Sequence, residues 1–253
     1  FSAVFEMDEK ANVINEWFGR TVIHSDRRFA YEDAQVRLET GEGDLADELA
    51  LMFKLATKLR ENRFENGGID FNTEEVRFEL DESGKPLRVV IKRMRESNKL
   101  IEDFMLLANV RVARFLAKVH PEKKTPTRTS IYRVHDNPDP EKLQALRVFV
   151  RRFGHELPKP QKGNAEALIR DLLKATAGTP EEGTVKTMAI RSMAKAEYSS
   201  TNIGHYGLSF PYYTHFTSPI RRYPDVIVHR LLQHYLDGGK DADQNELDSR
   251  CQH

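Results

Sequence analysis

The stretch "HYGLSFPYYTHFTSPIRRYPDVIVHRLL", residues 205–232, decides how this sequence is interpreted. It joins a segment rich in aromatic residues and histidine to a run whose apolar positions have helical spacing. Ser218 is a good N-cap and Pro219 suits the first helical position, so we predict that a helix begins there. The backbone amides near Ile220 and Arg221 would then point out of the helix and favour an anion.

Arg221 and Arg222 add planar, bidentate guanidinium groups to this predicted phosphate site. Because cations oppose the dipole at a helix N-terminus, pairing with a carboxylate such as Asp225 is an open alternative. Pro224 lies within the predicted helix and lacks an N–H group. It therefore either kinks the first turns or marks the true start of the helix, which would leave both arginines in the preceding turn.

Histidine and aromatic side chains are dense around this segment. The histidine spacings match no familiar zinc motif, so we interpret these residues as structural or RNA-facing. Aromatic rings interleaved with arginine suit base stacking, and they equally suit a packed core beneath a loop. The histidines are His205, His215, His229 and His234, and the aromatic residues are Tyr206, Phe210, Tyr212, Tyr213, Phe216 and Tyr223.

Length and composition restrict the protein class. The 253 residues suffice for one large domain or two small ones, with 39% hydrophobic and 31% charged residues. Lys+Arg and Asp+Glu both number 39, so any nucleic-acid site must be a local patch. The single cysteine, Cys251, excludes an intramolecular disulfide and a cysteine-based zinc cluster. We expect a soluble cytoplasmic monomer without a membrane span.

Two hairpins are predicted early in the chain, over residues 1–23 and 75–94, from alternating apolar positions on either side of turn residues. The chain opens in mid-strand at Phe1, so we expect a fragment of a longer protein. Strands that come early and helices that come late favour an α+β class over a doubly wound sheet. The predicted helices cover residues 31–38, 45–64, 99–119, 140–157, 164–178, 181–199 and 220–239.

The helix predicted from residue 99, capped by Ser97 or Asn98, carries polar side chains among apolar neighbours. Glu102 and Asn109 stand seven residues apart, nearly on one stripe. A carboxylate there must find a partner or face a cavity, unless Glu102 and Asp103 are first-turn acids that favour the helix dipole. The sequence contains no phosphate-binding glycine loop and no nucleophile elbow.

Residues 205–232 resemble the signature segment of the RNB family of exoribonucleases, and most of all its RNase R branch. Further blocks resemble that domain in the same order, so the likeness covers nearly the whole chain. It implies an α+β RNB-type catalytic domain of antiparallel hairpins packed with many helices, of which residues 1–253 form the central and C-terminal part. These blocks are "FSAVFEMDEKANV", "RFAYEDAQ", "GGIDFNTEEVRFELDESGKP" and "NKLIEDFMLLANVRVARFL".

The resemblance implies processive 3′-5′ hydrolysis of single-stranded RNA to nucleoside 5′-monophosphates by a two-metal mechanism. Arg221 matches the family's catalytic arginine, and Arg222 adds a contact to the substrate. Tyr31 and Glu102 match residues that engage the terminal ribose, which would distinguish RNA from DNA. Phe71 matches the aromatic residue that stacks on the last bases.

The sequence also departs from the family pattern. Most relatives have two glutamates at positions 102 and 103, and a small residue where this chain has Pro224. The family's aspartate cluster precedes the strand at Phe1, and a later glutamate and the RNA-binding β-barrels lie outside the chain. We therefore expect Mg²⁺ ligands mainly upstream and a chain inactive alone. The alternatives are a non-catalytic RNA-binding or regulatory member of the same fold, and a helical scaffold without nucleic acid.

Overall fold

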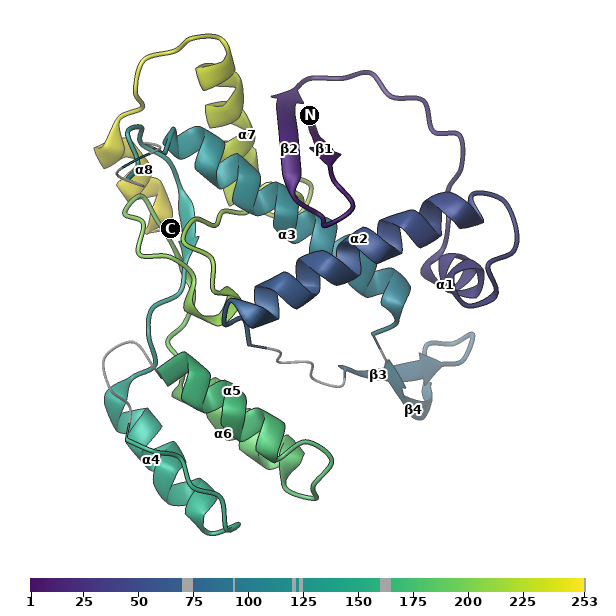
Figure 1. The fold of residues 1–253 in the computed structure, drawn as a ribbon, viewed down its shortest axis with the longest axis vertical. Coiled ribbons are helices and arrows are strands. Elements are labelled where there is room, and N and C mark those ends of the chain that lie inside the picture. Colours follow the sequence, from purple (N-terminus) through teal and green to yellow (C-terminus); the bar gives the residue numbers. More distant parts are fainter. Residues whose placement is uncertain (70–74, 93, 120–121, 123–124, 160–164, 253) are drawn as a thin grey trace.

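The computed structural model describes residues 1–69, 75–92, 94–119, 122, 125–159 and 165–252. Within them, three antiparallel strand pairs accompany a larger set of helices (Figure 1), which confirms the α+β class. The strands are β1 (Ser2–Met7), β2 (Val13–Gly19), β3 (Glu75–Leu80), β4 (Pro86–Lys92), β5 (Tyr132–Val134) and β6 (Glu197–Ser199). The helices are α1 (Tyr31–Thr40), α2 (Ala46–Glu65), α3 (Glu96–Ala117), α4 (Pro140–Arg151), α5 (Ala165–Ala175), α6 (Glu182–Ser192), the 3₁₀ turn η1 (Tyr206–Leu208), α7 (Tyr223–Leu236) and α8 (Gln244–Cys251).

Both predicted hairpins form. Strand β1 pairs with β2 and strand β3 pairs with β4, each antiparallel. Ala3 and Phe5 of β1 and the preceding Phe1 pack against the main core, whereas Val4, on the opposite face, is exposed. The alternation of the sequence therefore determined which face of this hairpin is buried.

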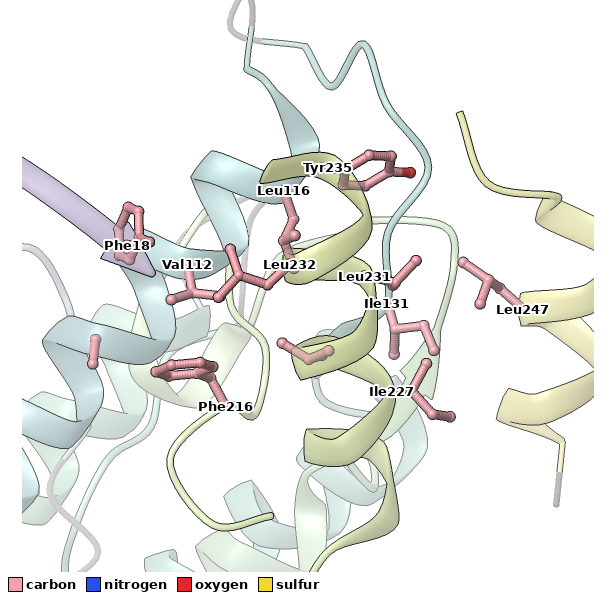
Figure 2. Packing of buried hydrophobic residues seen from close by; sticks show 12 residues of the cluster. Phe18, Val112, Leu116, Ile131, Phe216, Ile227, Leu231, Leu232, Tyr235 and Leu247 are labelled. Atoms are coloured by element: carbon pink, nitrogen blue, oxygen red, sulfur yellow. The ribbon is translucent and has the colours of Figure 1, made fainter. Parts of the chain in front are cut away.

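Helix α3 lies at the centre of the molecule, where it contacts α1, α2 and α7. The main core forms where α3 meets α7 and β2 (Figure 2). Val112 and Leu116 of α3 and Leu232 of α7 are each fully buried there, and Phe18 of β2 covers one side. Burial of each such side chain contributes about 1.5–3 kcal/mol, so α7 is firmly attached to α3.

A second cluster of apolar residues holds α4, α5 and α6 together. Leu146, Ile169 and Val185, one from each helix, are fully buried in it. In Figure 1 these helices project from one side of the α2–α3 pair. The chain thus has a second centre of packing. The sequence did not predict it, because no clear linker marks a separate part of the chain.

Helix α3 begins at Glu96, three residues before the predicted start. Neither Ser97 nor Asn98 is the N-cap, which is Arg95, although the Asn98 side chain accepts a hydrogen bond from the Arg95 amide. Ser97 binds a different part of the chain: its hydroxyl donates to the backbone carbonyl of Tyr31 at 2.9 Å. The helix start was mispredicted because Ser97 is used in a tertiary contact and not in a local cap.

Candidate functional site

Helix α7 begins at Tyr223, so the predicted start at Ser218 and Pro219 is wrong. Residues 218–222 form a turn in which the amides of Arg221 and Arg222 both donate to the carbonyl of Ser218, at 3.3 and 3.1 Å. Pro224 occupies the first turn of the helix, where a missing N–H costs nothing. The alternative that Pro224 marks the true start is confirmed, and the arginines lie in the preceding turn.

A fully buried carboxylate, Asp225, holds this turn together. It lies in the first turn of α7, with no exposed side-chain surface. One oxygen, Oδ1, accepts hydrogen bonds from the Ser218 amide at 2.8 Å and from Nη2 of Arg222 at 2.9 Å. The other, Oδ2, lies 2.9 Å from Nε of Arg222. The alternative in which an arginine pairs with Asp225 is thus confirmed for Arg222.

Arg221 has a different environment from its neighbour. Its side chain is exposed, and it makes no ion pair or side-chain hydrogen bond with the described part of the chain. The side chains of Ile220 and Tyr223 on either side are 102% and 59% exposed. The turn therefore presents one free guanidinium group beside an apolar and an aromatic side chain, a combination suited to a phosphate and an adjacent base.

Asn109 of α3 fixes the segment that leads into the turn. Its side chain is buried, its Oδ1 accepts a hydrogen bond from the Phe216 amide at 2.9 Å, and its Nδ2 donates to the Tyr213 hydroxyl at 3.3 Å. The hydroxyl of Thr214, also buried, donates to the carbonyl of Ile131. These contacts attach the 213–216 segment to the protein interior, so the turn that follows has a defined position.

The histidines near the turn are structural. His215 shares a 2.7 Å hydrogen bond with the hydroxyl of Tyr198, and His229 donates from Nε2 to the carbonyl of Phe216. Burial lowers the pKa of His215 to about 4, assisted by the charge of Arg222, and burial with nearby His135 lowers that of His205 to about 3. Both rings are therefore uncharged at neutral pH.

The aromatic residues divide between the two interpretations that the sequence left open. Tyr212, Tyr213 and Phe216 are buried and belong to the core, and Tyr206 and Phe210 are partly buried. Tyr223 alone of the six is largely exposed. The packed-core interpretation thus holds for most of the cluster, and only Tyr223 remains available to stack on a base.

Among the acids of α3, Asp103 and not Glu102 is the buried one. Asp103 is 4% exposed and accepts a 3.0 Å hydrogen bond from Nε of Arg60 on α2, while Nη2 of Arg63 lies 3.8 Å away. Burial raises the pKa of Asp103 to about 6, against the opposing effect of Arg60. Glu102 points outward without an ion pair to any described residue, and the helix start at Glu96 excludes the first-turn explanation.

Tyr31, the first residue of α1, lies against the beginning of α3. Its carbonyl accepts the Ser97 hydroxyl, and Gln35 one turn later accepts the Ser97 amide at 3.0 Å. The Tyr31 side chain is 47% exposed. The helix that carries Glu102 is thus joined directly to Tyr31, whereas Phe71 lies outside the described residues.

Asp225, Asp103 and Arg60 shape this site and were not identified as site residues from the sequence. The i,i+3 spacing of Arg222 and Asp225 was a usable signal that these two side chains could pair. No local signal connects Asp103 to Arg60, because 43 residues separate them. Among the described residues, no group of three or more His, Cys, Asp or Glu could hold a metal ion, and no helix is long and apolar enough to cross a membrane.

Comparison with known proteins identifies the family of this chain. A family model described as RNB domain matches residues 1–238. The chain belongs to the RNB domain family. The resemblance seen in the sequence is thereby confirmed, and an RNB domain includes both the turn with Arg221 and the helix with Glu102.

Curated proteins similar to this RNB domain include Ribonuclease R of Aquifex aeolicus, 35% identical over 245 residues, and human Exosome complex exonuclease RRP44, 36% identical over 241 residues. The alignments cover 94% and 92% of this chain but 34% and 24% of those proteins. The chain therefore spans about a quarter to about a third of the length of these relatives.

Solved structures share the fold of this RNB domain. Mycoplasma genitalium RNase R in complex with ribose methylated single-stranded RNA superposes with a TM-score of 0.84 at 27% identity, covering 98% of this chain and 39% of that one. Yeast Ssd1, described as a pseudonuclease, superposes with a TM-score of 0.71 at 18% identity. The second likeness concerns the fold alone.

Proposed function

We propose that this RNB domain forms the substrate-binding part of a 3′-5′ exoribonuclease that hydrolyses single-stranded RNA to nucleoside 5′-monophosphates. One observation carries the proposal: Arg221 has an exposed guanidinium without an ion pair to any described residue, on a turn that the buried Asp225 holds in place. A fixed cation without an internal partner costs little reorganisation when it meets a phosphate. Relatives named ribonucleases and exonucleases support the same chemistry.

In this proposal Arg221 contacts the scissile phosphate and stabilises the negative charge that develops during hydrolysis. Arg222 acts mainly as a positioning residue, because Asp225 already occupies its guanidinium. Tyr31 and Glu102, both exposed on joined helices, would contact the 2′-hydroxyl of the terminal ribose. Phe71 would stack on the terminal bases.

A two-metal mechanism with Mg²⁺ requires carboxylates that hold the ions. The described residues do not fit this requirement, since they contain no suitable group of acidic or histidine side chains. No step of the reaction is therefore assigned to a metal through these residues. The ligands of such ions would have to come from outside the described part of the chain.

The turnover test uses the full-length product of the gene that encodes this chain. Replacing Arg221 with alanine should lower single-turnover hydrolysis of an oligoribonucleotide by about 100- to 1,000-fold, a loss typical of removing one transition-state contact. RNA affinity should change by only a few-fold. Arg230→Ala, an exposed arginine further along α7, is the control. Equal turnover in the Arg221 and control variants would contradict the assigned role.

A non-catalytic RNA-binding member of the family is the second candidate, because Ssd1 shows that the fold also occurs in a protein described as a pseudonuclease. The same full-length protein distinguishes the two candidates. Magnesium-dependent release of nucleoside monophosphates supports the enzyme, and stable RNA binding without any release supports the second candidate. Absence of binding even at low salt favours a scaffold without nucleic acid.

A further inference from the structure

A second concentration of positive charge lies at the opposite end of α7 from Arg221. Arg111 and Arg114 project from the last turns of α3, Lys118 is the C-cap of that helix, and Arg128 approaches from the following loop. All four line one pocket of 540 Å³, which Tyr235 near the end of α7 also lines. Because α7 has 14 residues, this pocket lies about 20 Å along the helix from the Arg221 turn.

Most of this charge is not neutralised within the described residues. Arg111 forms an ion pair with Glu16 of β2, the one acidic side chain that the described lining contributes. Arg114 and Lys118 are exposed and have no ion pair with any described residue. Arg128 lies over the ring of Tyr235, 4.8 Å from its centroid, which orients the guanidinium without removing its charge. Three net positive charges therefore face the pocket.

The helix C-terminus accounts for only part of this cluster of cations. Lysine and arginine often stabilise the last carbonyls of a helix. Here backbone groups do so: the amides of Thr127 and Arg128 both donate to the carbonyl of Ala117, at 2.8 and 3.1 Å. Arg111 lies before the last turn and Arg128 belongs to a different segment, so a favourable dipole concerns Arg114 and Lys118 alone.

The backbone at Lys118 supports a role for its side chain. Lys118 is the C-cap of α3 and has a left-handed conformation, with φ of 43°. Glycine is the usual residue at such a helix end because it adopts this conformation without strain. A lysine there places an ammonium group at the pocket at the cost of about 1 kcal/mol or more of backbone strain.

We infer that this pocket, lined by Arg111, Arg114, Lys118 and Arg128, is a second anion site that binds phosphates of the RNA backbone away from Arg221. Arginine forks suit phosphate oxygens, and a volume of 540 Å³ accommodates a phosphodiester with its sugar. The inference rests on the proposed function for the identity of the ligand. The pocket would anchor the RNA at a distance from the reacting bond. The Arg221 turn alone does not provide such an anchor.

The test measures binding of a fluorescently labelled oligouridylate to the 253-residue chain between about 50 and about 200 mM salt. The double substitution Arg114→Gln and Lys118→Gln should weaken binding by about 10-fold and lower the salt slope by up to about 1.4, because two phosphate contacts are lost. The matched control is Arg151→Gln with Arg152→Gln, two exposed cations at the end of α4. It should change the affinity by less than about two-fold.

The outcomes show whether the pocket proposal fails alone or together with the proposed function. If the pocket and control variants weaken binding equally, or if oligoglutamate of equal charge competes as strongly as RNA, the pocket is not a phosphate site. If the unchanged chain binds RNA and the pocket variant binds it equally tightly, the inference fails while the proposed function stands. If the unchanged chain binds no RNA at low salt, both fail. Equal circular dichroism and thermal unfolding of all variants would show that each one is folded.

Discussion

The Arg222–Asp225 pair at the start of α7 and the Arg60–Asp103 pair between α2 and α3 each hold a buried aspartate with an arginine, but over different distances along the chain. In each, one member of an adjacent pair of charged residues is fixed and its neighbour, Arg221 or Glu102, points outward. Asp225 binds an arginine three residues away and stabilises a single turn. Asp103 binds an arginine 43 residues away and joins two helices. The comparison shows that a buried aspartate can order a loop or connect two elements.

The largest effect on stability is expected at Asp225. Replacing it with alanine leaves the buried face of Arg222 and the Ser218 amide without their acceptor, which should lower the free energy of unfolding by about 3–5 kcal/mol. Urea unfolding followed by circular dichroism measures this difference. Asp237→Ala, at the exposed end of the same helix, is the control. A loss at Asp225 no larger than the control would show that the turn is held by other contacts.

Asp103 should have a smaller effect that depends on pH. Since burial raises its pKa to about 6, the folded chain binds more protons at this group than the unfolded chain. The resulting stabilisation is complete at low pH and is lost as the pH rises through about 6. Relative to an Asp103→Asn chain, the unchanged chain should therefore lose up to about 3 kcal/mol of unfolding free energy between about pH 4 and about pH 7. A difference that does not vary with pH would contradict this result.

The outward-pointing acid beside Asp103 should affect selectivity more than stability. In the full-length gene product, replacing Glu102 and Tyr31 together with alanine should reduce the preference for RNA over DNA by about 10-fold, because two contacts to the 2′-hydroxyl are lost. Turnover on RNA and DNA oligonucleotides of the same sequence gives this ratio. Glu61→Ala, an exposed acid on α2, is the control. An unchanged ratio in the double variant would argue against the ribose contact.

The smallest effect on the free energy of unfolding is expected at Arg221 itself. Because this side chain makes no ion pair with the described residues, Arg221→Gln should change the unfolding free energy by less than about 0.5 kcal/mol. Arg222→Gln, one residue later, should cost several times more, since it leaves the buried Asp225 without its cation. Thermal unfolding of the two variants compares them directly. Equal losses would mean that both arginines have structural partners.

Segments with a strong local period could be predicted from the sequence. The two hairpins follow from alternation around turn residues, and the helices at α1 and α2 follow from apolar spacing. The start of α7 was mispredicted because Ser218 and Pro219 have favourable cap and first-turn chemistry, which the structure places instead in a turn before Pro224. The short β5–β6 pair and helix α8 were not predicted, because their few residues carry little periodic signal.

The candidate site likewise has a part that could be predicted from the sequence and a part that could not. The segment containing Arg221 was identified from residue types, and pairing of an arginine with Asp225 was kept as an alternative because cations oppose the dipole at a helix N-terminus. That Arg222 and not Arg221 is the paired arginine depends on how the turn directs each side chain, and this direction is set by Asn109, Thr214 and the buried Asp225. The partner of Asp103 could not be deduced, since it requires the crossing of α2 over α3.

By itself, the sequence determined the mixed hairpin and helix content and the family, because both depend on local periodicity and on the order of characteristic segments. Only the tertiary structure decided which charges are free. Burial removes water from a carboxylate and forces it to take a cation, so the helices that bury Asp225 and Asp103 select Arg222 and Arg60 as partners. Arg221 and Glu102 stay accessible to a ligand as a consequence of that selection.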